Sequence, residues 1–164
     1  IPNLSGEKDF QWVTDVVNRT LADIPEDVHT SWHFCLGNAW GNKMHGMTAG
    51  GYEKILHRYF DTHVEQFVLD FACREMEDVA FLSDLPQNKT VAAGVIDVRS
   101  LEIETTEQVA TRIRKVLDVV PAERVWITTD CGLKQLPRVC AAAKLRSLVA
   151  GTRVVRRELN GGDL

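Results

Sequence analysis

Two periodicities of hydrophobic residues alternate along this chain of 164 residues. Segments with apolar residues every three to four positions predict helices, and shorter segments rich in valine, isoleucine and aromatic residues predict strands. The first strand alternates, with Trp32 and Phe34 on a face that packs on helices and His33 and Cys35 on the other. The expected order is helix 8–23, strand 28–35, a loop rich in glycine and asparagine over 37–46, helix 51–62, strand 67–71, strand 91–98, helix 105–120, strand 125–130 and helix 137–150.

This order of elements predicts an α/β fold, because strands that alternate with helices pair in parallel through right-handed crossovers. Four such strands amount to half of an eight-stranded β/α barrel, which typically needs about 250 residues. We therefore expect residues 1–164 to form a single partial domain, the C-terminal half of a TIM-type (β/α)8 barrel. Its partner would be the N-terminal half of the barrel or another copy in a homo-oligomer.

Composition narrows the classes of partner. The chain is 45% hydrophobic and 26% charged, as expected for one soluble globular unit, and its net charge is −4. No basic stripe with interleaved aromatic residues predicts a nucleic-acid surface, and no run of about 20 apolar residues predicts a membrane span. No secretory leader is visible, and the four cysteines are widely spaced, so we expect reduced thiols in a cytoplasm: Cys35, Cys73, Cys131 and Cys140.

The candidate chemistry begins with His33 and Cys35, which lie two apart on a predicted strand and therefore project to the same side. Cys131 also follows a hydrophobic strand, and it precedes a glycine. Imidazole and thiolate are the ligands that zinc takes most readily. We predict a zinc site at these three residues, although a buried cysteine beside a hydrogen-bonded histidine is the alternative. A zinc held by two thiolates and one imidazole can activate a third thiol, which favours alkyl transfer to sulfur.

Asp70 ends the second predicted strand, and a buried carboxylate there needs a partner for its charge. It is predicted either to be a fourth metal ligand or to orient His33 from behind. The alternative is a salt bridge with Arg74 or Arg99.

Asp97 and Arg99 close the third predicted strand and are the candidate catalytic residues. A guanidinium at the mouth of a barrel suits a carboxylate, sulfonate or phosphate on a substrate. Pairing of Arg99 with Glu102 or Asp70 is the structural alternative.

These residues belong to four segments that resemble the C-terminal catalytic domain of cobalamin-independent methionine synthase. The resemblance includes the family's shorter relatives, among them the epoxyalkane–coenzyme M transferases, and it extends from about residue 10 to residue 158. The segments are His33-Phe34-Cys35, Leu69-Asp70-Phe71-Ala72, Gly94-Val95-Ile96-Asp97-Val98, and Pro121-Ala122-Glu123-Arg124 leading into Asp130-Cys131-Gly132-Leu133.

The resemblance implies a β/α barrel whose zinc is held by His33, Cys35, Cys131 and Asp70, where relatives usually carry a glutamate. It also implies that zinc binds a thiol substrate as thiolate and that the sulfur attacks a methyl carbon of methyltetrahydrofolate or another electrophile. Methionine synthase carries a histidine at the position of Arg99, so its proposed proton donor is missing here. The earlier half of the barrel is missing too, so we expect the chain to be inactive alone.

Three functions follow as hypotheses. The first is a zinc-dependent S-methyltransferase that uses a small-molecule thiol and a methyl donor, as in transfer from 5-methyltetrahydrofolate to homocysteine. The second is addition of a thiol such as coenzyme M to an epoxide, with Arg99 holding the anionic thiol. The third is a metal-binding half-barrel that has lost catalysis.

Overall fold

Four parallel strands form one sheet in the order β1-β2-β3-β4. The computed structural model describes residues 7–35 and 51–161, so the loop expected over 37–46 lies outside the described residues. The strands are β1 (Ser31–Phe34), β2 (Gln66–Asp70), β3 (Thr90–Gly94) and β4 (Val125–Thr128). The predicted α/β class with parallel pairing is confirmed.

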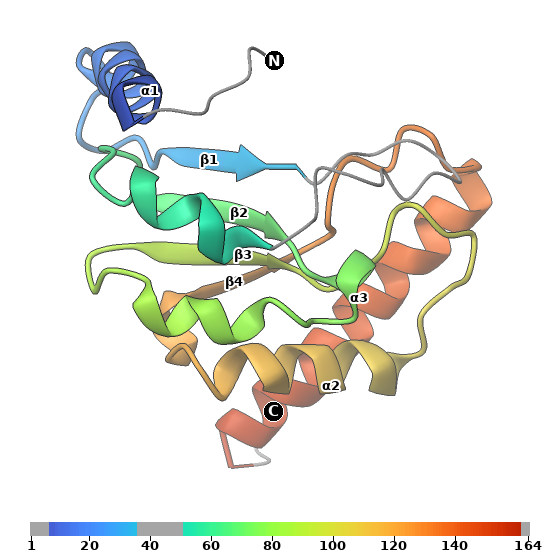
Figure 1. The fold of residues 1–164 in the computed structure, drawn as a ribbon. Helices are drawn as coiled ribbons and strands as arrows, with labels where there is room; N and C mark the ends of the chain where they lie inside the picture. Colours follow the sequence, from blue (N-terminus) through green and yellow to red (C-terminus); the bar gives the residue numbers. More distant parts are fainter. Residues whose placement is uncertain (1–6, 36–50, 162–164) are drawn as a thin grey trace.

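Helices separate the strands along the chain. The α-helices are α1 (Glu7–Leu21), α2 (Thr106–Leu117) and α3 (Arg138–Leu159), and the short 3-10 helices are η1 (Tyr52–Lys54), η2 (Leu56–Tyr59), η3 (Ala72–Arg74), η4 (Val79–Asp84) and η5 (Ala122–Arg124). Helices α2 and α3 pack against each other on the β4 side of the sheet, whereas α1 lies near β1 (Figure 1). No helix in the described part of the chain is long and apolar enough to cross a membrane.

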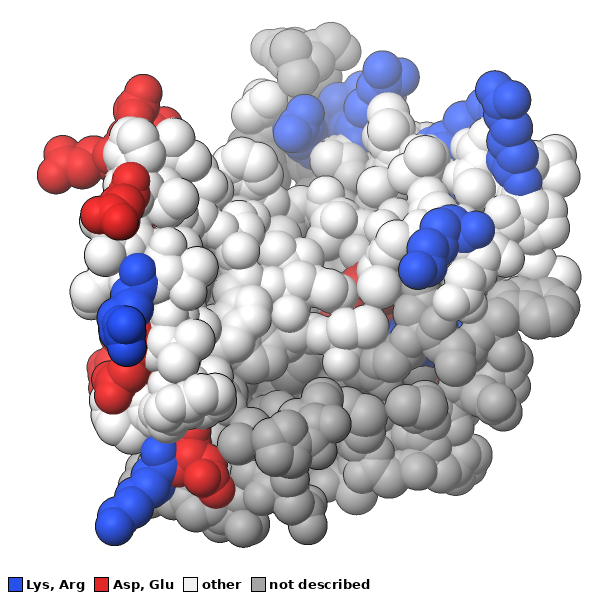
Figure 2. Space-filling view, turned by 90° about the horizontal axis from the view of Figure 1, so that it is seen from above, with Lys and Arg blue, Asp and Glu red and all other residues white. Residues whose placement is uncertain are grey.

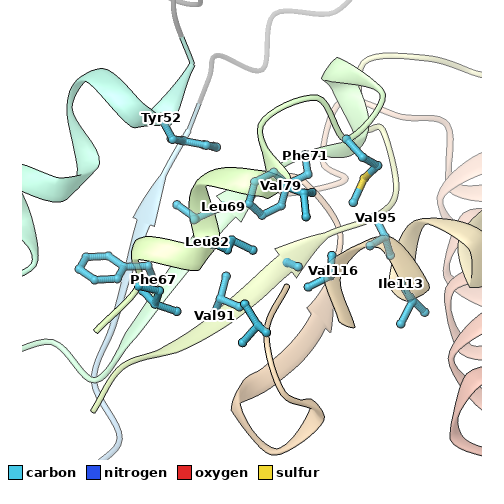
Figure 3. Close-up of a cluster of buried hydrophobic side chains, with 14 of the residues drawn as sticks. Tyr52, Phe67, Leu69, Phe71, Val79, Leu82, Val91, Val95, Ile113 and Val116 are labelled. Atoms are coloured by element: carbon cyan, nitrogen blue, oxygen red, sulfur yellow. The ribbon is translucent and has the colours of Figure 1, made fainter. Parts of the chain in front are cut away.

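One face of the sheet carries the hydrophobic core (Figure 3). Phe67 and Leu69 of β2 and Val91 of β3 are fully buried there, against Ile113 and Val116 of α2. The strand period of two puts the alternate residues on the opposite face. As predicted, Trp32 and Phe34 pack against the core. His33 therefore lies on the face that would be the inside of a barrel.

The third predicted strand ends early, at Gly94, so Asp97 and Arg99 lie in the following loop rather than on the strand. Residues 95 and 96 still bond to the backbone of β4 and the residues after it, and side chains bind other backbone groups of this loop. The Asp97 N–H donates to the Glu104 carboxylate at 2.9 Å, and Arg112 donates to the carbonyl directly after Gly94 at 2.9 Å.

The predicted helix over 51–62 is wrong, because this segment forms the short 3-10 helices η1 and η2. Its backbone closes i→i+3 bonds, such as those from Ile55 N–H to the Tyr52 carbonyl and from Arg58 N–H to the Ile55 carbonyl. Short 3-10 helices are common as connectors, and this segment connects β1 to β2 with Tyr52 and Leu56 buried in the core.

The last helix was predicted to end at Ala150, but α3 continues through Gly151 to Leu159. Gly151 marks a close contact rather than the end of the helix. A Cβ at this position would lie 2.6 Å from Val109 Cβ and 2.9 Å from the Thr106 carbonyl oxygen of α2. The missing side chain therefore lets the two helices approach.

Candidate metal centre

Three predicted ligands converge at the C-terminal ends of the strands. His33 lies on β1, Cys35 directly follows β1, and Cys131 lies just beyond β4. Their ligand atoms all lie within 4.8 Å of one another. The two sulfur atoms are 3.7 Å apart, close to the separation of about 3.8 Å that tetrahedral zinc with bonds of about 2.3 Å imposes on two thiolates. The donor set and its spacing therefore fit a zinc ion.

The ring of His33 is oriented by the backbone of β2. Its Nδ1 lies 3.1 Å from the carbonyl oxygen of Val68, which can only accept a hydrogen bond, so Nδ1 carries the proton. In the neutral imidazole this leaves the lone pair on Nε2, the atom nearer to the buried Asp70. A metal ligand needs such a lone pair, and a hydrogen bond from the other nitrogen usually fixes it.

Tyr52 connects the two strands that carry His33 and Asp70. Its hydroxyl donates to the Phe34 carbonyl at 3.0 Å and accepts from the Asp70 N–H at 2.7 Å. Burial, followed by the negative charge of Asp70, raises the pKa of Tyr52, so its hydroxyl keeps its proton. No pattern in the sequence indicates this role, because only the fold places Tyr52 against the strand ends.

Asp70 is fully buried and has two basic neighbours. Its Oδ2 accepts from Arg99 Nη2 at 2.9 Å, and its Oδ1 lies 3.9 Å from His33 Nε2. The alternative ion pair with Arg99 is therefore present, whereas Arg74 pairs with Asp78 at 2.6 Å. Asp70 is not part of the three-ligand group, and its direct coordination of metal stays a prediction.

Arg99 lies among three carboxylates, and only 10% of its side chain is exposed. Besides Asp70, its guanidinium lies 3.3 Å from Asp130 Oδ2 and 3.8 Å from Asp97 Oδ1. Asp97 also accepts from the Arg99 N–H at 2.8 Å and so closes a tight turn. Three carboxyl groups thus lie around one guanidinium.

Asp130 is the second fully buried carboxylate of the site, and no role for it was predicted. Its Oδ1 accepts from two backbone N–H groups and its Oδ2 from a third and from Arg99; the N–H groups are those of Phe71, Ala72 and Cys73. Burial and then the charge of Asp70 raise the pKa of Asp130 to about 7, against the opposing effect of its hydrogen bonds and Arg99. The available signal was that Asp130, like Asp70, closes a hydrophobic strand.

The other two cysteines differ from the converging pair. Cys140 is buried within α3, and its thiol lies 3.5 Å from the Leu101 carbonyl oxygen. Burial and the negative charge of Asp130 raise the pKa of the Cys73 thiol, so it stays protonated. Neither belongs to the group of metal-ligating atoms.

Comparison with known proteins agrees with this geometry. The family model for the catalytic domain of cobalamin-independent synthase matches residues 10–153. The methionine synthase of Saccharolobus solfataricus is 33% identical over 153 residues, which are 93% of this chain and 42% of that protein. The 2-hydroxypropyl-CoM lyase of Xanthobacter autotrophicus is 42% identical over 110 residues, which are 64% of this chain and 29% of that protein.

Solved structures give the same result. A B12-independent methionine synthase from a Shewanella species, in complex with selenomethionine, superimposes with a TM-score of 0.75 at 26% identity. The match covers 92% of this chain and 45% of that one, so the chain spans less than half the length of these relatives. The four parallel strands with their helices match this part of the barrel protein. The chain belongs to the family of cobalamin-independent methionine synthase catalytic domains.

Proposed function

We propose that this chain supplies the metal-binding half of a zinc-dependent S-methyltransferase, in which a donor of the 5-methyltetrahydrofolate type methylates homocysteine. The observation that carries the proposal is the convergence of His33, Cys35 and Cys131 at the strand ends. It occurs in a chain that is 33% identical, over nearly its whole length, to a methionine synthase.

His33, Cys35 and Cys131 would hold the zinc, which leaves a fourth position for a substrate thiol. When bound, zinc lowers the pKa of a thiol, so that a thiolate nucleophile exists near neutral pH. A reducing compartment such as the cytoplasm, which we propose for the chain, would keep Cys35 and Cys131 as free thiols for the metal.

Asp97 and Arg99 are the residues that we assign to the substrate side of the centre. Asp97 is 25% exposed, so its carboxylate is the more accessible of the two. The guanidinium of Arg99 stays charged at any working pH and is therefore a poor proton donor. Its role would be to hold an anionic group of the thiol substrate, with Asp97 fixing the turn that carries it.

A second candidate is thiol addition to an epoxide, as in the epoxyalkane–coenzyme M transferases. The 42% identity to a 2-hydroxypropyl-CoM lyase favours it, although that match spans only 64% of the chain. The cation of Arg99 suits a sulfonate as well as a carboxylate. The two candidates therefore share the metal centre and differ in thiol and electrophile.

The partner that we propose is a polypeptide equivalent to the unmatched half of the relatives. Both edge strands of the sheet, β1 and β4, have one neighbour each among the described residues. A groove of about 620 Å³ runs between β4, α2 and α3, with Trp126, Leu148 and Val149 in its lining. On the β1 side, seen from above, charged side chains stand at the margins and the surface between them is largely uncharged (Figure 2). Further strands and helices could cover both edges; a second copy of the chain is the alternative occupant.

The test is product analysis with zinc-loaded chain, alone and mixed with the segment of the Saccharolobus solfataricus enzyme that the chain does not match. One reaction contains homocysteine and methyltetrahydrofolate, and the other contains coenzyme M and epoxypropane. Methionine in the first reaction, dependent on the added segment, would support the leading proposal. Hydroxypropyl–coenzyme M would favour the second candidate, and zinc-loaded chain that forms neither product would favour the non-catalytic half-barrel.

A further inference from the structure

We propose that Asp130 is a positioning residue for the metal centre, which it holds together without touching the metal. It fixes Cys131, its neighbour in the chain, and it is connected through Arg99 and Asp70 to His33. This inference rests on the proposed function, since it takes His33, Cys35 and Cys131 as the ligands. It adds a role for a residue outside that set.

The first step is the attachment of Asp130 to the neighbouring strand ends. The three N–H groups that follow β2 donate to its two oxygens at 2.8–3.1 Å, and its own N–H donates to the Ile96 carbonyl beyond β3 at 3.0 Å. A Cβ on Gly94 would lie 2.7 Å from Asp130 Cα, so the glycine at the end of β3 is needed for this approach. Asp130 thus joins three strand ends: its carboxylate binds the backbone after β2, and its own backbone, just beyond β4, binds the segment after β3.

The second step is the effect on Cys131. This residue follows Asp130 directly, and its carbonyl accepts from the Thr129 hydroxyl at 2.8 Å. The backbone is therefore held on both sides of Cys131, at Asp130 before it and at the carbonyl of Cys131 itself after it. The position of the Cys131 sulfur, 3.7 Å from that of Cys35, follows from this anchoring.

The third step is the connection to His33. Arg99 bridges the two buried acids, with one nitrogen 3.3 Å from Asp130 Oδ2 and another 2.9 Å from Asp70 Oδ2. The other oxygen of Asp70 lies 3.9 Å from His33 Nε2. A change at Asp130 therefore alters the partner of Arg99 and, through it, the carboxylate behind the histidine ligand.

Electrostatics favours this arrangement of Asp130, Arg99 and Asp70. Two fully buried carboxylates repel each other and are expensive to desolvate unless a cation compensates both. The planar guanidinium can donate to two acids in fixed directions, whereas the ammonium of a lysine acts as a point charge. Asp130 and Arg99 should therefore act as a unit in placing the ligands.

The experiment compares metal binding by the whole chain with that of Asp130→Asn. An asparagine amide has one accepting oxygen, so it cannot accept from all three N–H groups and Arg99 as the carboxylate does. We expect the affinity for Zn²⁺ to fall about 10- to 100-fold, the usual range for residues that orient ligands. The Co²⁺-substituted variant should also lose absorbance from cobalt–thiolate bonding, because the Cys131 thiolate would be displaced from its coordinating position.

The matched control is Lys89→Met. Lys89 is also a buried charged residue, but it lies at the opposite end of the sheet, where its ammonium binds the Thr62 and Val64 carbonyls at 2.6 Å. It should lower the melting temperature and leave Zn²⁺ affinity and the Co²⁺ spectrum unchanged. This control separates loss of stability from loss of ligand placement.

Arg99→Lys provides a second measurement in case Asp130→Asn does not fold. It keeps the positive charge but loses the two-acid bridge, so we expect a smaller fall in affinity, of several-fold, with altered Co²⁺ absorbance. If Asp130→Asn folds and keeps the wild-type Zn²⁺ affinity and Co²⁺ spectrum, the inference is overturned and the proposed metal site remains. If only Arg99→Lys folds, the same result in that variant overturns the inference. A wild-type chain that binds no Zn²⁺ would overturn both.

Discussion

Cys35 and Cys131 are the residues on which the metal proposal depends most directly. Their thiols are 3.7 Å apart and come from opposite edges of the sheet, from β1 and β4. Serine replaces the thiolate with a poorer zinc ligand, so Cys35→Ser and Cys131→Ser should each lose most of the bound zinc. Metal content after dialysis, measured by atomic emission, checks this.

Cys140→Ser is the control for these variants, because Cys140 is buried in α3 and does not belong to the ligand group. It should retain about one zinc per chain. Full zinc retention in both Cys35→Ser and Cys131→Ser would exclude the site.

Asp70 gives a second prediction, in which stability and metal binding should change together. Asp70→Asn removes a charge-assisted hydrogen bond to Arg99, which should cost roughly 1.5–3 kcal/mol of unfolding free energy. It also removes the carboxylate beside His33, so zinc affinity should fall about 10- to 100-fold. Zinc titration with parallel thermal melts measures both effects; a loss of stability with full zinc affinity would mean that Asp70 serves only as a partner for Arg99.

At this scale the sequence predicted the residues whose chemistry is local. His33 and Cys35 share a face because of the strand period, and Cys131 follows a recognisable strand. Tyr52 and Asp130 were not predicted, because their roles depend on backbone groups contributed by distant segments. The second contact of Arg99, with Asp130, likewise exists only after β3 and β4 pair.

Gly151 gives a prediction at the scale of the packed helices α2 and α3. Alanine at this position would raise intrinsic helix propensity by about 1 kcal/mol, but its Cβ would lie 2.6 Å from Val109 Cβ. The contact is with a rigid branched residue and a backbone carbonyl, so overpacking should prevail, at about 1–3 kcal/mol before the propensity gain. We expect Gly151→Ala to lower the unfolding free energy measured in urea by up to about 2 kcal/mol, which is the cost of overpacking less the propensity gain.

Val109→Ala in the same chain tests the cause. It removes part of the contact, so the double variant should lose less than the sum of the two single losses. A more stable Gly151→Ala would show that propensity outweighs the contact.

The elements that the sequence predicted well are those with strong local signals. Helix α2 begins as expected, because Thr105 and Gln108 form a capping box in which each side chain binds the other's backbone N–H. The segment after Gly51, predicted as one helix, forms two short 3-10 helices, and its sequence has no capping signal of the kind that marks the start of α2. The predicted end of α3 at Ala150 is too early, because in the sequence a glycine that packs closely against another helix cannot be told from a glycine that terminates one.

At the scale of the whole molecule, β4 has one neighbouring strand, β3, within the described part of the chain, and it lies beside a largely apolar groove. The four-stranded half-barrel was predictable because strands alternating with helices permit few other arrangements. The proposed partner for this groove was not predictable in detail, because the alternation of strands and helices describes only the elements of this chain. An edge strand presents backbone N–H and C=O groups with which a further strand can pair, so the edge at β4 is a typical docking site.

Val149 lines this groove and is 47% exposed, so it provides a direct test of the occupant. Val149→Glu adds a charge that solvent accommodates in the isolated chain but that an occupied groove would bury without a partner. Association with the complementary segment of the Saccharolobus solfataricus enzyme, measured by sedimentation, should weaken at least about tenfold, equivalent to 1.4 kcal/mol, while zinc affinity stays unchanged.

Val139→Glu is the matched control, because Val139 lies on the same helix, is 77% exposed and is not part of the groove lining. Equal weakening by both variants would mean that added charge acts non-specifically, and self-association of the chain that only Val149→Glu abolishes would identify a second copy as the occupant.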